Sequence, residues 1–353
     1  MQHFAKPENA LKRADELLDV SRPEEALVAL HDLLSSKRHR TWQPELELVI
    51  NKFLKICVSL RRSKAAKDGL FQYRIICEKV NVASLEAVLR AFMDDAAAAA
   101  ADAIALAERT VSDKVANLLD FEDLEAEETP ESLMLATIGG SADSKKRTDR
   151  LIVTPALKFL WEAYRTVLDL LRRNEKMEEV YREAAARAFA FCLEYKRTLE
   201  FRRLSEMLRL HIVSQLKHDP KWSKEPPTPE SLQVHLETRF AQLDTAVSME
   251  LWQEAYRTVE DVHLLMLQMT KPPRAATLAA YNAQLAKVFW VADNRLFHAY
   301  TVHRVYSVSQ LLKAPPAATE NATLASRAVL AALSIPLTSA VVDVNLLEYD
   351  IEH

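Results

Sequence analysis

The sequence predicts an all-α protein, an α-solenoid in which helical hairpins stack on one another. Three observations lead to this fold class. Apolar residues recur at three- and four-residue spacing through most of the 353-residue chain. Only 3 residues are glycine, against a usual share of about 7%. One helical motif recurs with a small residue at a fixed place, as close helix–helix packing requires.

The glycine shortage also excludes several classes of function. Phosphate-cradling loops, tight hairpins and nucleophile elbows depend on glycine for backbone conformations that other residues resist. The chain contains no GxGxxG, GxxxxGK[ST] or GxSxG motif. Most nucleotide-binding folds and α/β-hydrolase folds are therefore excluded.

The clearest apolar stripe lies in residues 248–265, which we expect to form one half of a hairpin between two others. The residues that share the stripe are Leu251, Ala255, Val259, Val262 and Met266. Trp252 and Tyr256 are predicted to widen the stripe on one side.

A similar sequence pattern occurs elsewhere in the chain. Residues 24–34 (EEALVALHDLL) and 253–263 (QEAYRTVEDVH) both contain Glu-Ala followed by an Asp six residues after the Ala. A weaker relative, LFHAYTVHRVY at 296–306, has Ala299 in the place of the alanine. These repeats are typical of tetratricopeptide-like hairpins, although that repeat's Gly and Pro positions are absent. Unrelated amphipathic helices in a bundle are the alternative.

Proline, capping residues and periodicity give the order of elements. Thr41 and Ser84 are expected to cap the helices that follow them. The predicted helices are 7–20, 23–36, 43–61, 63–80, 84–118, 155–173, 176–196, 198–217, 230–246, 248–269, 275–291, 294–313 and 319–334.

The chain is predicted to have three parts. Residues 1–118 form the N-terminal helical repeats and end in a long Ala-rich helix, whose smooth surface lets another helix lie close. Residues 119–153 form an acidic and polar linker, and residues 154–353 form a second helical-repeat block. Net charge alternates along the chain, from +4 over residues 1–80 to −10 over 81–131. Such blocks indicate several charged partner surfaces.

The three cysteines, Cys57, Cys77 and Cys192, lie in apolar helical contexts and form no CxxC pair. This pattern is typical of buried thiols in a reducing compartment. The first residues are charged and lack the apolar stretch of a signal peptide, and no apolar run reaches about 18 residues. We expect a soluble, cytoplasmic protein that does not bind a membrane.

The residues give no catalytic, cofactor-binding or metal-binding site. His298 and His303 are five residues apart and therefore fall on different helix faces. His211 and His218 share a face but lack an acidic ligand at a useful spacing. His235 and His263 are expected to be surface or hydrogen-bonded core histidines. No catalytic triad is visible, although triads assemble in space. Trp161, Trp252 and Trp290 lie on apolar stripes and are expected in the core.

Two basic clusters are the candidate contact residues. One consists of Lys37, Arg38, His39 and Arg40, and the other of Arg61, Arg62, Lys64 and Lys67. We place both clusters at connections between helices, and we count the second as the next connection but one after the first. In a stack of hairpins such connections emerge on the same edge, so the two clusters are predicted to form a single basic rim. Such a rim attracts RNA phosphates through counterion release. An ordinary solvated surface is the alternative reading.

Long strings of this chain resemble the N-terminal part of the A subunit of eukaryotic translation initiation factor 3. The strings are PENALKRADELL at 7–18, RHRTWQ at 38–43, FQYRIICEKVNVASLEAVLRAF at 71–92, RTDRLIVTPALKFLWEAYRTVLDLLR at 147–172, HLETRFAQLDTAVSMELWQEAYRTVEDVH at 235–263 and RAVLAALSIPL at 327–337. The Ala-rich stretch 96–107 and the segment after Thr338 depart most from the family.

The resemblance implies a non-enzymatic scaffold without a cofactor. The family has tetratricopeptide-like repeats followed by a PCI module that ends in a winged helix, and this chain ends at His353, before the winged helix. The implied partners are the small ribosomal subunit near the messenger exit, through ribosomal protein or rRNA, and subunits c and b of the same factor, with messenger RNA met indirectly. The two basic clusters are then the candidate ribosome contacts.

Two other functions compete with this one. A PCI-type scaffold subunit of another large assembly, the proteasome lid or the signalosome, would use the same helical surfaces. A helical enzyme would need a deep pocket with convergent, strongly perturbed acids or histidines.

Overall fold

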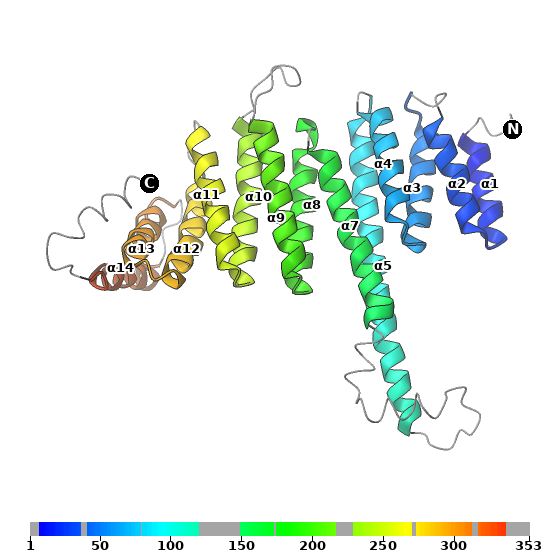
Figure 1. Ribbon diagram of the computed structural model, residues 1–353. Helices are drawn as coiled ribbons and strands as arrows, with labels where there is room; N and C mark the ends of the chain where they lie inside the picture. The colour runs from blue at the N-terminus through cyan, green and yellow to red at the C-terminus, as the bar shows by residue number, and fades with distance from the viewer. Residues whose placement is uncertain are drawn as a thin grey trace. The chain divides into compact units, whose positions relative to one another are not determined.

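The computed structural model describes residues 7–36, 41–78, 80–119, 149–172, 174–216, 229–269, 273–312 and 317–336. These ranges contain thirteen α-helices, one π-helix and one 3-10 helix, and no strand. Within the units, consecutive helices such as α1 and α2, α3 and α4, α10 and α11, and α12 and α13 pack as antiparallel hairpins, which confirms the predicted all-α solenoid (Figure 1). None of the described helices is long and apolar enough to cross a membrane.

The chain forms two compact units, Met1–Ala188 and Phe189–His353, and the division falls inside α8. The first unit contains α1 (Pro7–Asp19), α2 (Pro23–Ser35), α3 (Pro44–Ser59), α4 (Ser63–Cys77), α5 (Val82–Leu119), η2 (Asp149–Val153), α7 (Thr154–Leu171), η3 (Glu175–Met177) and the first part of α8 (Glu178–Glu194). The second contains α9 (Thr198–Leu216), α10 (Pro229–Ser248), α11 (Trp252–Gln268), α12 (Ala275–Val291), α13 (Arg295–Ser309) and α14 (Ala318–Leu333).

The long helix α5 organises the first unit. Its alanines Ala96, Ala100, Ala103 and Ala107 are buried and recur at four- and three-residue spacing, so they form one stripe. Both α7 and η2 pack against α5, as expected for a smooth helix surface. Figure 1 shows α5 extending beyond the ends of α3 and α4. The prediction began the second block at residue 154, but the packing of α7 against α4 and α5 groups it with the first unit.

Buried polar contacts fix how the helices of this unit meet. The Tyr73 hydroxyl on α4 lies 2.7 Å from Oγ of Ser84 on α5, and Ser84 donates to Glu47 Oε2 on α3 at 2.6 Å. Ser84 therefore ties three helices together and is not the N-cap that we predicted. Asn81, the residue before α5, caps it by accepting a bond from the Ser84 amide at 3.2 Å.

One backbone turn recurs at five helix–helix connections. The residues Ser21, Arg61, Lys196, Glu250 and Asp293 all have φ between 51 and 59°. At each turn the next residue's amide bonds back across the helix end, as Leu251 N does to Ala246 O at 2.9 Å. The amide of the left-handed residue also bonds to the carbonyl oxygen three residues earlier, as Glu250 N does to Val247 O at 3.1 Å. These two bonds define a Schellman motif, which usually has glycine at the left-handed position. The solenoid thus repeats its turn without using glycine.

In three of the five helices that follow this turn, a small residue occupies the same place. The fourth residue after the N-cap is Ala26 in α2, Ala66 in α4 and Ala255 in α11, and each is at most 2% exposed. The similar segments 24–34 and 253–263 therefore occupy the same place in their repeats. In α13 this place belongs to His298, so the alignment of 296–306 on Ala299 was wrong by one residue.

Some predicted core positions lie at the surface. The side chains of Ala255, Val259 and Val262 are buried as expected, but Tyr256 is 49% exposed and does not widen the stripe. Trp290 is 67% exposed and was wrongly placed in the core. Thr41 does not cap α3, because Gln43 occupies the N-cap position.

Candidate interaction surface

The predicted basic residues that the structure describes lie at one end of the hairpin α3–α4. Arg61 occupies the left-handed position of the turn, and its Nη1 lies 3.5 Å from the carbonyl oxygen of Ile152 in η2. Arg62 is the N-cap of α4, and its Nη2 is 2.5 Å from Glu24 Oε1 on α2. Lys64 and Lys67 follow in the first turns of α4 and are exposed. Residues 37–40, which carry the other cluster, lie outside the described residues.

The single basic rim does not follow from this arrangement. Residues 37–40 connect α2 to α3, and Arg61 and Arg62 connect α3 to α4, so the two connections are consecutive. They flank opposite ends of α3, whose 16 residues span roughly 24 Å. The prediction that the second cluster lies at the next connection but one was therefore wrong. The two clusters must be treated as separate surfaces.

The connection that does share an edge with Arg61 and Arg62 is the turn between α1 and α2. The ion pair between Arg62 and Glu24 places the start of α2 beside the start of α4. Arg22, the N-cap of α2, lies in this turn and pairs with Glu25 at 3.2 Å. Sequence reasoning missed Arg22 as a member of this edge, although a correct count of the connections would have found it.

These ion pairs leave the cations available to a partner. The side chains of Arg22, Glu25, Arg62 and Glu24 are each more than half exposed. Exposed pairs of this kind contribute about 0–1 kcal/mol, so a partner's phosphate or carboxylate can replace them. The Lys67 ammonium lies 5.8 Å from the Phe71 ring centre and has no ion pair with a described residue. This edge can therefore attract anions, but it is not a built pocket.

Two histidines, His211 and His235, are packed inside the second unit. His211 on α9 and His235 on α10 are 3% and 5% exposed, and burial, followed by the charges of Arg239 and His211, lowers the pKa of His235 to about 4. Arg239 is buried with them and donates from Nη1 to Gln242 Oε1 at 2.5 Å. Its Nη1 also lies 3.6 Å from Asp261 Oδ2 on α11. This cluster joins three helices inside the second unit.

No reactive group stands out in the described part of the chain. Burial raises the pKa of the thiols of Cys57 and Cys192 to about 12 and that of Cys77 to about 11, so these cysteines stay protonated near neutral pH. All three are buried and free, as predicted. Within the described ranges, no group of three or more His, Cys, Asp or Glu side chains is placed to hold a metal ion.

The stacked hairpins, their shared Schellman turns and their buried small residues define a tetratricopeptide-like helical-repeat protein. A family model described as "eIF3a, PCI domain, TPR-like region" matches residues 8–351. The chain therefore belongs to the family of the A subunit of eukaryotic translation initiation factor 3. This membership removes the proteasome-lid and signalosome alternatives as the family of the chain.

Individual relatives give the same result. The chain is 47% identical over 337 residues to the A subunit of eukaryotic translation initiation factor 3 of Arabidopsis thaliana, covering 95% of this chain and 34% of the relative. It is 45% identical over 353 residues to the Homo sapiens protein of the same name, covering 99% of this chain and 25% of the relative. The Nematostella vectensis protein is 47% identical over 337 residues, with 95% and 35% covered. The chain thus spans between a quarter and about a third of these relatives.

Proposed function

We propose that this chain is the helical-repeat part of a non-enzymatic scaffold subunit in translation initiation. It binds the small ribosomal subunit near the messenger exit and associates with subunits c and b of initiation factor 3 in the cytoplasm, while messenger RNA is met indirectly. The observation that carries this proposal is the match to the A-subunit family over residues 8–351, which spans both units.

The surface chemistry supports a docking role. A hairpin array exposes the ends and one face of every helix, so its binding surface is large compared with that of a compact domain. The edge formed by Arg22, Arg61 and Arg62 is cationic and only weakly paired within the chain. Residues 37–40 supply a second cationic segment at the other end of α3. Because rRNA is a polyanion, both surfaces suit contact with rRNA or with an acidic ribosomal protein.

The test is sedimentation of the purified chain with small ribosomal subunits at increasing salt. We expect co-sedimentation at low salt and an affinity that falls linearly with salt on a double logarithmic plot, because phosphate contacts release counterions. Two charge reversals separate the two surfaces, Arg61→Glu with Arg62→Glu and Arg38→Glu with Arg40→Glu. The reversal at the surface in use should weaken binding by more than about tenfold.

A matched control makes the same change in net charge elsewhere. Arg274→Glu with Arg304→Glu reverses two exposed cations of the second unit and should leave binding within about threefold of the original. Equal binding by all variants would remove the basic contacts but leave the scaffold proposal open to its second test. In that test the tagged chain is purified from cytoplasmic extract, and recovery of proteasome-lid or signalosome subunits in place of initiation factor 3 subunits would overturn the proposed function.

A further inference from the structure

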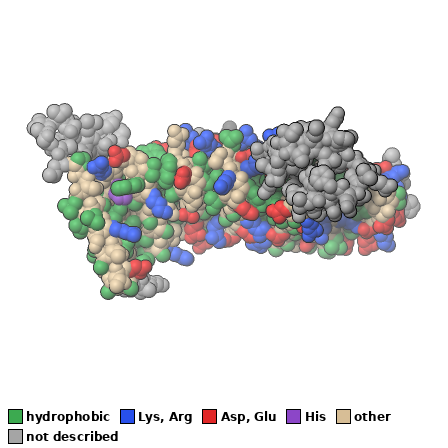
Figure 2. Space-filling view, turned by 90° about the horizontal axis from the view of Figure 1, so that it is seen from below, with side chains coloured by type: hydrophobic (Ala, Val, Ile, Leu, Met, Phe, Trp, Pro, Cys, Tyr) green, Lys and Arg blue, Asp and Glu red, His purple; other side chains and the backbone are tan. Residues whose placement is uncertain are grey.

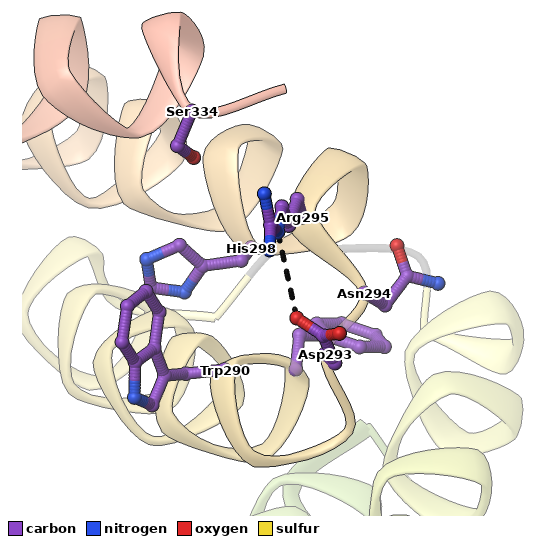
Figure 3. A pocket seen from close by; sticks show the side chains of 7 residues that line it. Trp290, Asp293, Asn294, Arg295, His298 and Ser334 are labelled. Atoms are coloured by element: carbon purple, nitrogen blue, oxygen red, sulfur yellow. Dashed lines mark hydrogen bonds and ion pairs between the residues drawn. The ribbon is translucent and has the colours of Figure 1, made fainter. Parts of the chain in front are cut away.

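A cavity of about 370 Å³ opens at the turn between α12 and α13. It is lined by Phe289, Trp290, Asp293, Asn294, Arg295, His298 and Ser334 (Figure 3). This volume is at the lower end of the range for small ligand pockets and suits one or two amino-acid side chains. Ser334 comes from the end of α14, so three helices of the second unit build the cavity.

Aromatic contacts hold the floor of the cavity in place. The rings of Trp290 on α12 and His298 on α13 have centroids 5.1 Å apart, and those of Phe289 and Phe297 are stacked at 5.3 Å. The His298 ring is oriented by its Nδ1, which donates to the carbonyl oxygen of Ala286 at 2.9 Å. The site therefore exists before a ligand arrives, which lowers the entropic cost of binding.

Trp290 is an unusual residue to leave in water. It is 67% exposed, although tryptophan is usually among the more buried residues. Tryptophan and arginine are the residue types most enriched among those that dominate binding energies at interfaces. Here Arg295 lies across the cavity from Trp290, as Figure 3 shows. An apolar group on Trp290 would thus lie close to a guanidinium.

The Arg295 guanidinium is held only loosely within the chain. Its Nε lies 3.4 Å from Asp293 Oδ1, with 53% and 83% of the two side chains exposed. Such a pair contributes about 0–1 kcal/mol, so a partner's carboxylate can share or replace it. The N-terminus of α13 lies at the same place, capped by Asn294, whose Oδ1 accepts from the Phe297 amide at 3.2 Å. Its helix dipole adds to the attraction for an anion.

The surrounding surface is apolar and mildly basic. Between residues 275 and 312 the charged side chains are Lys287, Arg295 and Arg304 against Asp293 alone, in a chain of net charge −4. Figure 2 shows hydrophobic and basic side chains with few acidic ones over this end of the second unit. A partner with a carboxylate is therefore attracted, while a strongly basic one is not.

A polyanion fits less well than a peptide. Asp293 is among the lining residues, and Arg295 is the one arginine or lysine among them. The end of α14 also brings backbone carbonyls, although the amides of Ser334 and Ile335 already bond those of Leu330, Ala331 and Ala332. A row of phosphates would meet more repulsion here than a single carboxylate would.

From these contacts we propose that the α12–α13 cavity binds a short linear peptide segment of a partner protein. An apolar side chain of the peptide packs on Trp290, and an adjacent Asp or Glu carboxylate pairs with Arg295. The site lies on the second unit and includes none of the basic residues of the first, so its test needs no ribosome. Its failure would leave the proposed function standing.

The experiment measures binding of a fluorescein-labelled peptide, in which two leucines are flanked by glutamates, to the full chain by fluorescence anisotropy. We expect saturable binding that weakens by at least about tenfold in Trp290→Ala and in Arg295→Glu. Trp290→Phe keeps an aromatic surface and should stay within about threefold of the original. Circular dichroism checks that each variant is folded, which the exposure of both side chains favours.

Matched controls separate local contact from general charge. Arg304→Glu lies on the same helix outside the cavity, and Tyr256→Ala removes an exposed aromatic from α11; both should bind within about threefold of the original chain. Peptides with lysine for glutamate or serine for leucine should not bind.

Three results would overturn the proposal. They are equal binding by the Trp290 and Arg295 variants, Arg295-dependent binding of a short RNA without binding of the peptide, and binding of the peptide only after removal of residues 337–353. The last result would mean that the chain itself fills the cavity.

Discussion

Replacing Gly69 by alanine tests how tightly the helices of the first unit pack. Gly69 lies inside α4 and is buried. A Cβ added there would lie 2.3 Å from Cε1 of Phe53 on α3, and further ring carbons would follow at 3.0 and 3.1 Å. Phe53 is itself 0% exposed, so the ring is surrounded on all sides.

Two opposing effects decide the sign of the change. Alanine is favoured over glycine in a helix interior by about 1 kcal/mol. Against this, the ring must move by roughly 1 Å to restore ordinary contact, and overpacking of a core costs about 1–3 kcal/mol. Because Phe53 has no open side to move toward, we expect the cost near the upper end. Gly69→Ala should therefore lower the free energy of unfolding by about 1–2 kcal/mol.

The assay is denaturant unfolding of the chain followed by circular dichroism. Phe53→Leu removes the ring carbons that the new methyl group would meet, so Gly69→Ala in that background should be neutral or stabilising. A Gly69→Ala variant that is stabilised by about 1 kcal/mol in the original background would refute the reasoning, because helix propensity alone would then account for the result.

Two further perturbations follow from particular residues. Glu250→Gly should stabilise the chain by about 0.5–1 kcal/mol. Glycine removes the cost of about 1–2 kcal/mol that a residue with a side chain has in the left-handed conformation, but its greater freedom in the unfolded chain offsets part of this gain. Glu250→Ala keeps the strained Cβ, and a gain as large as that of glycine in thermal melts would contradict this account. His235 has a folded pKa of about 4, below the value of about 6.5 in an unfolded chain, so the unfolded chain binds the extra proton between these pH values. The free energy of unfolding is therefore highest, as far as His235 is concerned, above pH 6.5, and it falls by up to about 3 kcal/mol as the pH is lowered towards 4. His235→Gln should flatten this part of the stability profile, whereas replacing the exposed His303 by Gln should not.

Much of the fold could be predicted from the sequence because helical periodicity is a local property. The predicted helix at 275–291 coincides with α12, and the other predicted ends differ from the observed ones by a few residues. The largest differences are four residues, at the end of α13 and at Ser248, which was predicted to start a helix but ends α10. Periodicity continues through a short turn when the next helix presents its apolar face to the same core, so it marks faces better than ends.

The turn that repeats through the solenoid had no signal in the sequence. Its left-handed position is filled by Ser21, Arg61, Lys196, Glu250 and Asp293, which share neither size nor charge. The turn is instead held by two backbone bonds at the end of the preceding helix, such as Glu250 N to Val247 O and Leu251 N to Ala246 O, which almost any residue's backbone can make. For the same reason the register of His298 could be found only after the turns were aligned.

The candidate contact residues show the same division. The sequence identified Arg61 and Arg62 as exposed cations, and the structure places both at a turn. The sequence could not show that Arg62 pairs with Glu24, and the miscounted connection wrongly joined this cluster to residues 37–40. Which edge a cation occupies depends on whether the number of intervening helices is even or odd.

The sequence by itself determined the all-α class, the hairpin repeat, the buried thiols and the family. The tertiary structure alone decided that Ser84 joins three helices, that His235 and Arg239 are both buried and that Trp290 stays exposed across a cavity from Arg295. The physical reason is that periodicity shows which residues share a helix face. Whether that face is covered depends on the neighbouring helices that pack against it.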